Sequence, residues 1–462
     1  MSPHAVVRPS LFFRPEVAGA LIPCTSFQGD DLKLEYQLAL RHPDGRRELV
    51  PFTKRLDVGG KSIGLYPSPP RQLGTNTSTV WTREFADEWV KAGVTSVVDA
   101  IRSAEAHIRS RVWFPEAERE GVYAVLTLWT LLTHVAPMFK AVPYLHITGE
   151  PDSGKTETLN ALKDLVFRPI ASSNTSAPAL FRYLDTLGGT LLLDEAEHLG
   201  GGFGQQSELM PMLLSGYKPG SPVLRCHGDD HDVREFNVFG PKAIAGITIL
   251  PPALRSRCIP LEMCPRPLGE ASTPPAVNPR GIASQLLAVA LDHAFDLQDR
   301  IAAGPRDNGL ANRRAEVWGP LFILARFLAE RGVSGLLERL TTYVEAADES
   351  AAGPVTPHLA AGLALLGLRR MGATPTCGEV LKRLQHEDPV TWTGTSDRRV
   401  GALLRSIGLP GDRESRGFTF RQSVAEIENA IRKAGGSVPN ATEACASTAG
   451  ETQSEPAPEQ AA

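Results

Sequence analysis

The stretch Gly149-Glu150-Pro151-Asp152-Ser153-Gly154-Lys155-Thr156 decides the interpretation of the whole chain, because it fits the pattern GxxxxGK[ST] in full. The apolar run Tyr144–Thr148 precedes it, and a helical pattern begins near Lys155. A strand, a tight loop and a helix in this order are the context that the pattern requires. The glycines of the pattern allow backbone angles that a Cβ would oppose. The sequence therefore predicts a loop whose backbone N–H groups surround an anion at a helix N-terminus.

This loop has the chemistry to hold a nucleoside triphosphate together with a magnesium ion. Lys155 is long enough to reach the β- and γ-phosphates, and Thr156 can place its hydroxyl on Mg²⁺. We therefore expect ATP and Mg²⁺ as cofactors. The residues expected to bind the nucleotide are Gly149, Glu150, Pro151, Asp152, Ser153, Gly154, Lys155 and Thr156.

A second apolar run, Gly189–Leu193, ends in two adjacent acids, Asp194 and Glu195. Asp194 is suited to hold Mg²⁺ through water, and Glu195 can position and deprotonate an attacking water molecule. The expected metal ligands are thus Thr156 and Asp194. A kinase that transfers phosphate to a small molecule does not need a water-activating Glu here, so the acid pair favours hydrolysis over metabolic phosphotransfer.

A third element follows the predicted strand Lys242–Ile247. Thr248, at the end of this strand, is a candidate to contact the γ-phosphate or the water. Arg257, which we prefer over Arg255, is placed to reach the nucleotide of a neighbouring subunit as an arginine finger. The alternative is an arginine that only forms a surface ion pair. The expected catalytic residues are Glu195, Lys155 and Arg257.

Composition limits the other classes of protein. A length of 462 residues predicts two to four domains, and 42% hydrophobic with 22% charged residues is ordinary for globular ones. The six cysteines form no CxxC pair, so we expect reduced structural thiols rather than a zinc site. The net charge of −4 does not indicate a strongly basic nucleic-acid binder. We see no signal peptide and no apolar run long enough to span a membrane, and expect a cytoplasmic protein without a membrane partner.

Periodicity divides the chain into parts. Apolar residues alternate with polar ones from Leu32 to Leu40, as in a half-buried strand, whereas helical patterns followed by a short strand pair near the C-terminus are typical of a winged helix. The expected parts are a β-rich region (1–114), a P-loop ATPase core (115–265), a helical lid or linker (266–350), a winged-helix-like domain (351–434) and a disordered tail (435–462).

Beyond these motifs, further segments resemble a bacterial P-loop ATPase domain of phage, plasmid and integrated-element proteins, over roughly residues 120–335. That domain is similar to AAA+ ATPases of the primase-helicase and minichromosome-maintenance type. The segments that carry the resemblance are Leu126–Trp129, Pro143–Gly149, Leu191–Glu197, Leu213–Gly220, Phe239–Ile247, Leu250–Ile259 and Arg313–Leu321. The sequence departs from the family's pattern around Arg257, at Pro252, Ser256 and Cys258.

The resemblance implies an α/β, AAA+-like P-loop NTPase fold and Mg²⁺-dependent ATP hydrolysis coupled to work on DNA, in a homo-oligomeric ring. By this resemblance, Lys155, Thr156, Asp194 and Glu195 match positions of the family's nucleotide site. Arg257 matches the arginine that such proteins keep after a Leu-Pro run. The resemblance also implies a lid arginine, which is Arg313 or Arg314. By the same resemblance, Val223–Val238 is a hairpin that touches DNA in a central pore, with Arg225 and Arg234 as contacts, although a solvated hairpin is an equal alternative.

Two functions remain open at this point. The first is a DNA-dependent helicase or translocase in the replication of a mobile element, with single-stranded or forked DNA as partner and a separate primase or initiator. The second is an ATP-gated regulator or loader that does not unwind DNA, which the acidic net charge favours. For the winged-helix-like domain two roles remain open, binding of duplex DNA and contact with protein only.

Overall fold

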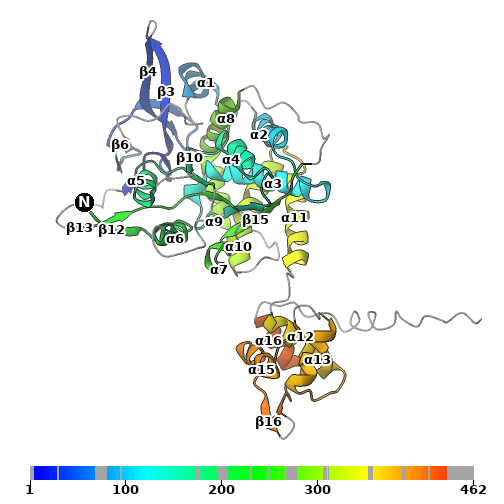
Figure 1. Cartoon of the computed structure of the whole chain (residues 1–462). Coiled ribbons are helices and arrows are strands. Elements are labelled where there is room, and N and C mark those ends of the chain that lie inside the picture. Colours follow the sequence, from blue (N-terminus) through cyan, green and yellow to red (C-terminus); the bar gives the residue numbers. More distant parts are fainter. Residues whose placement is uncertain are drawn as a thin grey trace, which may run out of the picture. The chain divides into compact units, whose positions relative to one another are not determined.

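The computed structural model describes residues 5–28, 31–67, 81–93, 96–172, 176–194, 206–227, 232–246, 250–266, 278–304, 310, 312–351, 357–387, 392–414 and 417–433. The chain divides into two compact units, Met1–Tyr343 and Val344–Ala462 (Figure 1). The tail expected at 435–462 lies outside the described residues, as do residues 267–277 of the expected lid or linker.

A parallel five-stranded sheet forms the centre of the first unit, so the fold is mixed α/β. Its strands lie in the order β10-β11-β14-β9-β15, and every pairing between neighbours is parallel. All side chains of β11 and β14 are buried, as expected for a parallel sheet that is covered on both faces. The strands are β9 (Tyr144–Gly149), β10 (Pro169–Ser172), β11 (Thr190–Leu193), β14 (Lys242–Ala245) and β15 (Cys258–Met263).

Helices cover this sheet. α4 follows β9 and packs on β9, β10 and β14, while α3 packs against α2 and α10 (Figure 1). The helices of this unit are α1 (Arg83–Ala92), α2 (Val97–Arg111), α3 (Glu116–Thr133), α4 (Lys155–Lys163), α5 (Ala177–Leu187), α6 (Gln206–Ser215), α7 (Pro252–Arg255), α8 (Pro279–Asp292), α9 (Ala294–Ala303), α10 (Asn312–Ala329) and α11 (Leu336–Ala351), with the 3₁₀ turn η1 (Ala136–Met138).

Antiparallel strands dominate the N-terminal region. β3 pairs with β2, β4 and β8 in a sheet completed by β5, and β1, β7 and β6 form a second sheet. Trp81 and Trp89 share a buried cluster with Phe167, Leu287 and Leu291, so this region is packed onto the helices that follow it. The strands are β1 (Ala5–Val7), β2 (Leu11–Phe13), β3 (Ala18–Gln28), β4 (Asp31–Arg41), β5 (Arg47–Pro51), β6 (Arg55–Val58), β7 (Lys61–Leu65) and β8 (Trp81–Thr82).

The β-rich region expected at 1–114 ends earlier than predicted, because α1 and α2 occupy much of residues 83–111. Ile101, Ala104 and Ile108 are buried at helical spacing on α2, which packs against α3, α4 and α8. Burying each isoleucine contributes about 1.5–3 kcal/mol, and this tertiary contribution makes α2 part of the helical layer around the sheet.

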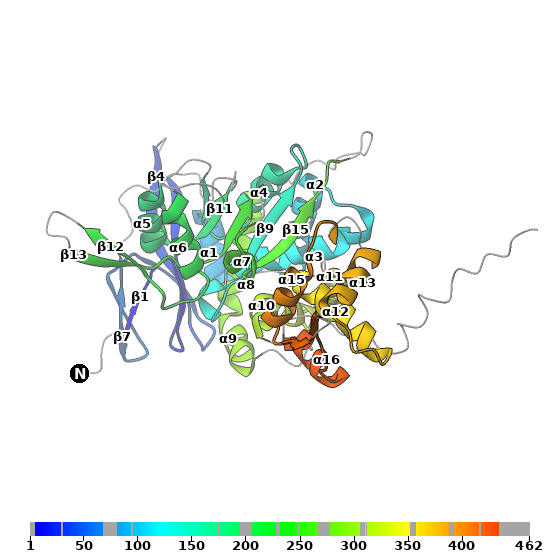
Figure 2. The ribbon, with the colours of Figure 1, turned by 60° about the horizontal axis from the view of Figure 1, so that its bottom comes forward.

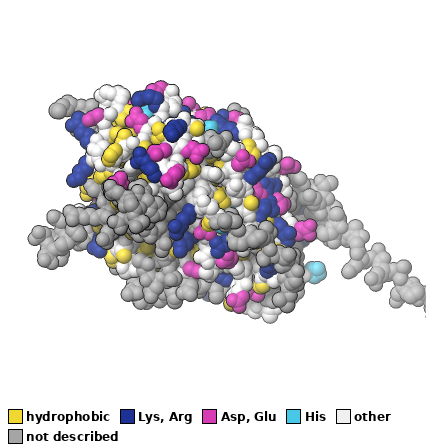
Figure 3. Space-filling view, turned by 90° about the horizontal axis from the view of Figure 1, so that it is seen from above, with side chains coloured by type: hydrophobic (Ala, Val, Ile, Leu, Met, Phe, Trp, Pro, Cys, Tyr) yellow, Lys and Arg dark blue, Asp and Glu magenta, His cyan; other side chains and the backbone are white. Residues whose placement is uncertain are grey.

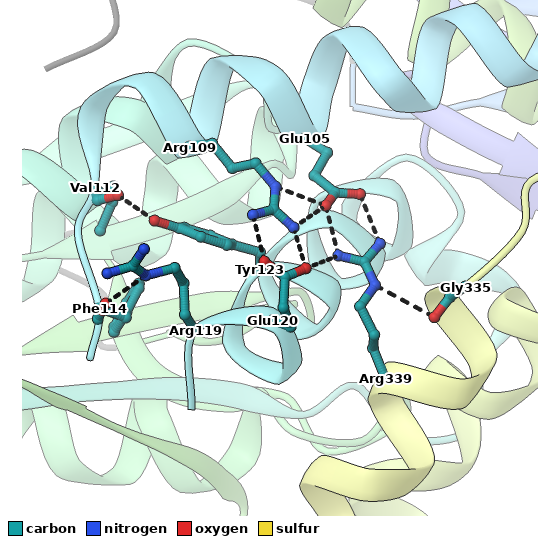
Figure 4. Close-up of polar contacts among 9 residues, drawn as sticks. All are labelled: Glu105, Arg109, Val112, Phe114, Arg119, Glu120, Tyr123, Gly335 and Arg339. Atoms are coloured by element: carbon teal, nitrogen blue, oxygen red, sulfur yellow. Dashed lines mark hydrogen bonds and ion pairs between the residues drawn. The ribbon is translucent and has the colours of Figure 1, made fainter. Parts of the chain in front are cut away.

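A network of two arginines and two glutamates holds α2, α3 and α11 together (Figure 4). Arg109 bonds to Glu105 at 2.6 Å and to Glu120 at 2.5 Å, and Arg339 reaches Glu105 at 2.6 Å and Glu120 at 3.0 Å. Arg109 also lies 4.2 Å from the ring centre of Tyr123. Burial by itself raises the pKa of Glu105, but the hydrogen bonds from Arg339 and Arg109 outweigh it, and the pKa stays below its ordinary value.

The second unit has its own buried cluster, which includes Leu365, Val380, Leu404, Phe420 and Ile431. In the part of this unit that the structure describes, α12, α13 and α15 come first, then a two-stranded hairpin and a last helix. The boundary between the units falls inside α11 rather than at 350. The elements are α12 (Pro357–Arg370), α13 (Cys377–Glu387), α15 (Asp397–Ser406), β16 (Asp412–Glu414), β17 (Gly417–Thr419) and α16 (Val424–Lys433). Among the described residues of the whole chain, no helix is long and apolar enough to cross a membrane.

Candidate nucleotide-binding site

The loop Gly149–Thr156 lies at the carboxyl end of β9, where open parallel sheets bind their ligands (Figure 2). Gly149 has a φ of 152°, and a Cβ added there would lie 2.4 Å from the carbonyl oxygen of Met263. Gly154 has a φ of 92° and forms the N-cap of α4 without a side-chain cap. The first N–H groups of α4 are therefore free of a capping side chain and face the loop, as an anion site requires.

Lys155 folds its side chain back over the loop. Its Nζ donates hydrogen bonds to the carbonyl oxygens of Gly149 at 2.8 Å and Glu150 at 2.6 Å, and lies 3.4 Å from Oγ of Ser153. Asp152 has a φ of 61°, a left-handed conformation that Asp tolerates better than most residues. The loop is thus closed around the ammonium group, which lies where the phosphates of a nucleotide would need a cation.

Thr156 and Asp194 come together from different elements. Oγ1 of Thr156, on the first turn of α4, donates a hydrogen bond of 2.8 Å to Oδ2 of Asp194 at the end of β11. A hydroxyl and a carboxylate in contact are hard oxygen donors, the type that Mg²⁺ prefers when substrate phosphates and waters complete its shell. The residues present therefore fit a magnesium ion. No group of three or more His, Cys, Asp or Glu side chains suited to a metal occurs among the described residues.

Neighbouring elements hold this site in place. Arg111 of α2 bridges Glu157 and Asp164 of α4, at 2.6 Å from each. Oγ1 of Thr158 donates to the carbonyl oxygen of Gly154 at 3.0 Å and contacts Met263 of β15. α4 is thus held by contacts with α2 and β15, and its N-terminal turn packs against β15, the strand next to β9.

Two of the expected residues cannot be placed. Glu195 and Thr248 lie outside the residues that the structure describes.

Arg257 lies at the opposite end of the sheet from the phosphate loop. Its carbonyl oxygen accepts a hydrogen bond of 3.0 Å from the amide of Tyr144, the first residue of β9. The loop begins at Gly149, five residues further along the strand, or about 16 Å at 3.3 Å per residue. An arginine side chain does not span this distance, so Arg257 does not reach the phosphate loop of its own chain.

Arg257 and Arg313 both lie near the aromatic ring of Tyr217. This contact was not predicted from the sequence. The guanidinium groups lie 5.6 Å and 5.2 Å from the centre of the Tyr217 ring. Burial raises the pKa of Tyr217 to about 12, although both arginines oppose this shift. Glu316 pairs with Arg313 at 2.6 Å. A lid arginine was expected at Arg313 or Arg314. Arg313 lies beside Arg257 at the ring of Tyr217, and not beside Lys155.

The hairpin expected at Val223–Val238 consists of β12 (Val223–His227) and β13 (Asp232–Phe236). Arg225 lies 5.5 Å from the ring centre of Phe181, and Arg234 lies 4.9 Å from that of Phe236. Both arginines therefore pack against aromatic rings of the unit's own core. The tip at 228–231 lies outside the described residues.

The face of the hairpin that carries Leu224 and Val233 also carries Glu235, which is exposed and lies opposite Leu224. Leu224 and Val233 are 53% and 67% exposed. On the face of the protein shown in Figure 3, basic and acidic side chains are interspersed rather than gathered in a basic stripe. Arg225 and Arg234 lie opposite each other in the hairpin, and the side chain of Arg234 is 41% exposed and 3.4 Å from Asp185.

No protein-family model matches this chain, and no curated protein matches its sequence. Solved structures that are similar to it include two helicases and the C-terminal region of NrS-1. "SCCmec type IV Cch - active helicase" is 9% identical and covers 92% of this chain and 99% of that one, with a TM-score of 0.35. The C-terminal region of NrS-1 is 10% identical, with coverage of 67% and 88% and a TM-score of 0.30. JCV helicase is 13% identical, with coverage of 57% and 64% and a TM-score of 0.24. All three TM-scores are below 0.5, so the assignment of a function depends on the geometry of the site itself.

Proposed function

We propose that this chain is a Mg²⁺-dependent ATPase with an AAA+-like P-loop core. The observation that carries the proposal is the hydrogen bond between Thr156 and Asp194 beside the loop that Lys155 closes. It brings the two predicted metal ligands together although 38 residues separate them. A phosphate-binding loop with an acidic strand end in contact is the arrangement that P-loop hydrolases use.

Each residue has a defined task in this proposal. The amides of the loop and of the first turn of α4 bind the phosphate oxygens, and Lys155 leaves its carbonyl partners to contact the β- and γ-phosphates. Thr156 and Asp194 hold the magnesium ion, which neutralises charge on the phosphates when bound. Glu195 remains the expected base for the attacking water.

The substitution Lys155→Ala tests this proposal directly. We expect phosphate release to fall by about 10²-fold or more, because the site loses its main cation. Lys163→Ala is the matched control, since Lys163 is exposed in the last turn of the same helix and lies far from the loop. Equal hydrolysis by the two variants contradicts the proposal.

We further propose that the ATPase works on DNA, as a helicase or translocase in the replication of a mobile element, and that it assembles into a ring. The assembly follows from the arginine-finger role expected for Arg257, because this residue does not reach the loop of its own chain and would have to act at the site of another subunit. Stimulation of hydrolysis by single-stranded or forked DNA, measured together with the particle mass in ATP, tests both parts. Basal hydrolysis that no DNA stimulates contradicts the first part, and a monomer in ATP contradicts the second.

An ATP-gated regulator or loader is the second candidate, and the hairpin favours it. Arg225 and Arg234 pack on aromatic rings, and the neighbouring side chains of Leu224 and Val233 are exposed and apolar. A loader of this kind changes its assembly between ATP and ADP without displacing a strand. ATP-driven strand displacement on a forked duplex eliminates this candidate.

A further inference from the structure

A cavity of about 270 Å³ lies at the opposite end of the central sheet from the phosphate loop. Residues 188–189, which precede β11, and residues 240–241, which precede β14, form part of its wall. The N-terminal segment 7–14 and the turn η1 contribute other parts. Ligand pockets usually measure about 300–1,000 Å³, so this cavity has the size for a molecule smaller than a nucleotide.

Two arginines line this cavity. The side chain of Arg8 is only 16% exposed, and burial lowers its pKa, although Asp185 opposes this shift. Nε of Arg14 is buried and has no hydrogen-bond partner among the described residues. Arginine keeps its charge in proteins, and a buried charge that is incompletely paired costs free energy. The cavity therefore offers positive groups that a bound anion would stabilise.

Polar atoms of Arg8 and Ser10 converge at one place in the wall. A Cβ built on Gly188 would lie 3.1 Å from Oγ of Ser10 and 3.3 Å from Nη1 of Arg8, so both atoms lie close to a single point. Nη2 of Arg8 donates a hydrogen bond of 3.0 Å to the carbonyl oxygen of Asn237. Because residue 188 is a glycine, with a φ of 61°, it adds no side chain beside the two donors. A hydroxyl and a guanidinium so close together can bind the oxygens of one anionic group.

The acids near this cavity have other partners. Asp185 lies 3.9 Å from Arg8, but it also lies 3.4 Å from Arg234, so two arginines share one carboxylate. Glu16 pairs with Lys61, whose hydrogen bond lowers the pKa of that carboxyl. Neither acid is among the described residues that line the cavity. Its polar side is therefore positively charged.

The rest of the wall is apolar. Phe13 and Phe239 are half-buried there, and Phe12 and Phe167 are buried, with Pro137 beside them in the lining. Such a surface is stabilised when an aromatic or aliphatic group covers it and removes it from water. A molecule with one anionic end and an apolar body matches both parts of the cavity.

We propose that this cavity binds a small organic anion. Its carboxylate or phosphate group contacts Arg8, Ser10 and Arg14, and its apolar body packs against Phe13 and Phe239. Guanidinium groups suit either anionic group, because their planar set of N–H donors forms paired hydrogen bonds to two oxygens. The cavity shares no residue with the phosphate loop, so this proposal does not rest on ATP hydrolysis.

The test titrates the full-length chain with benzoate and with phenyl phosphate, and measures binding by ligand-observed NMR. Benzamide is the uncharged analogue of benzoate. We expect at least one of the two anions to bind in the millimolar range, because so small a ligand makes few contacts, and benzamide to bind about fivefold more weakly or less. The tighter of the two anions identifies the preferred anionic group. The proposal is overturned if neither anion shows saturable binding by about 20 mM, or if benzamide binds as tightly as the better anion.

Substitutions assign the binding to this cavity. Arg8→Gln and Arg14→Gln should each weaken anion binding about fivefold or more, since each removes a charged donor. Arg55→Gln is the matched control, because it removes the same charge from the N-terminal region at an exposed ion pair with Asp57, and should bind like the parent chain. If melting temperatures show that Arg8→Gln does not fold, Arg14→Gln decides. Unchanged binding in Arg14→Gln, or an equal loss in the control, contradicts the proposal.

The anion site and the ATPase can fail separately. Lys155→Ala should bind the anion like the parent chain, because the phosphate loop lies at the other end of the sheet. Loss of anion binding in Lys155→Ala would place the probe at the phosphate loop and overturn the proposed site. If Lys155→Ala and Lys163→Ala hydrolyse ATP alike, the ATPase proposal fails, while the titrations of the arginine variants still decide on the cavity.

Discussion

The hydroxyl of Thr156 and the carboxylate of Asp194 are joined by a hydrogen bond of 2.8 Å that connects the first turn of α4 to the end of β11. β9 leads to α4, and β14 lies between β9 and β11 in the sheet. The contact therefore connects the ends of two strands that are separated by one other strand. In the proposed ATPase the same two oxygens turn to a magnesium ion. The relationship makes the Mg²⁺ requirement of the chain depend on two residues that can be changed separately.

Substitutions at Thr156 should separate the hydroxyl from the shape of the side chain. Thr156→Val keeps the volume but removes the oxygen, and we expect the Mg²⁺ concentration for half-maximal hydrolysis to rise about tenfold or more, which corresponds to losing one ligand worth about 1.4 kcal/mol. Thr156→Ser keeps the oxygen and should stay within about twofold of the parent chain. A magnesium titration of phosphate release measures both. Identical magnesium titrations for Thr156→Val and Thr156→Ser would show that the hydroxyl of Thr156 does not bind the metal.

Gly149 should not tolerate even a methyl group. A Cβ at this position would lie 2.4 Å from the backbone oxygen of Met263 and 2.7 Å from Oγ of Ser153, and the φ of 152° is rare for other residues. We expect Gly149→Ala to lose most of its affinity for a fluorescent ATP analogue. Gly319→Ala is the control, because nothing lies within 4 Å of the added Cβ and the residue is in a helix. Normal nucleotide affinity in Gly149→Ala would show that the loop does not need its close approach to β15.

Arg257 should act between subunits. Its distance from the phosphate loop of its own chain leaves only a neighbouring site within reach, so Arg257→Ala should lose hydrolysis by about 10³-fold. Mixing it with Lys155→Ala should restore part of the activity, because some interfaces then combine an intact loop with an intact arginine. Arg255→Ala, an exposed neighbour, should behave like the parent chain. No recovery in a mixture that is shown by mass to co-assemble would assign Arg257 a structural role on Tyr217.

Acid should loosen the contact between α11 and the core. The hydrogen bonds that Glu105 and Glu120 accept from Arg109 and Arg339 hold the pKa of both carboxyls below the ordinary value of 4.5. A lowered carboxyl pKa contributes stability that is present above the unfolded value and lost as the pH falls through the folded value. We therefore expect the stability from this network to be complete at pH 7 and to decline below about pH 4.5.

Arg339→Ala tests the network at pH 7. We expect a loss of roughly 1–3 kcal/mol in the free energy of unfolding, because two glutamates lose a charged donor. Amide exchange in α2 and α11, combined with urea unfolding, measures this loss. Arg83→Ala breaks an ion pair in which both side chains are about half exposed and should change little. Equal effects of the two substitutions would mean that the network adds nothing beyond a surface pair.

Much of the central sheet could be predicted from local patterns. The apolar run Gly189–Leu193 contains β11, and the strand expected at Lys242–Ile247 contains β14. β10 and β15 were not predicted as strands, because β10 begins with a proline and β15 contains one. α2 was missed as well, since its amphipathic pattern follows a region rich in alternating strands.

The sequence by itself determined the phosphate loop, because its glycines, Lys155 and Thr156 are contiguous and act through local backbone geometry. Only the tertiary structure decided which distant residues meet. The strand order β10-β11-β14-β9-β15 brings Asp194 to Thr156 and carries Arg257 to the far end of the same sheet. The tertiary structure likewise decided that Arg225 lies on the ring of Phe181, which a different element supplies. The physical reason is that a motif specifies its own turn, whereas contacts across a sheet depend on burial summed over the whole unit.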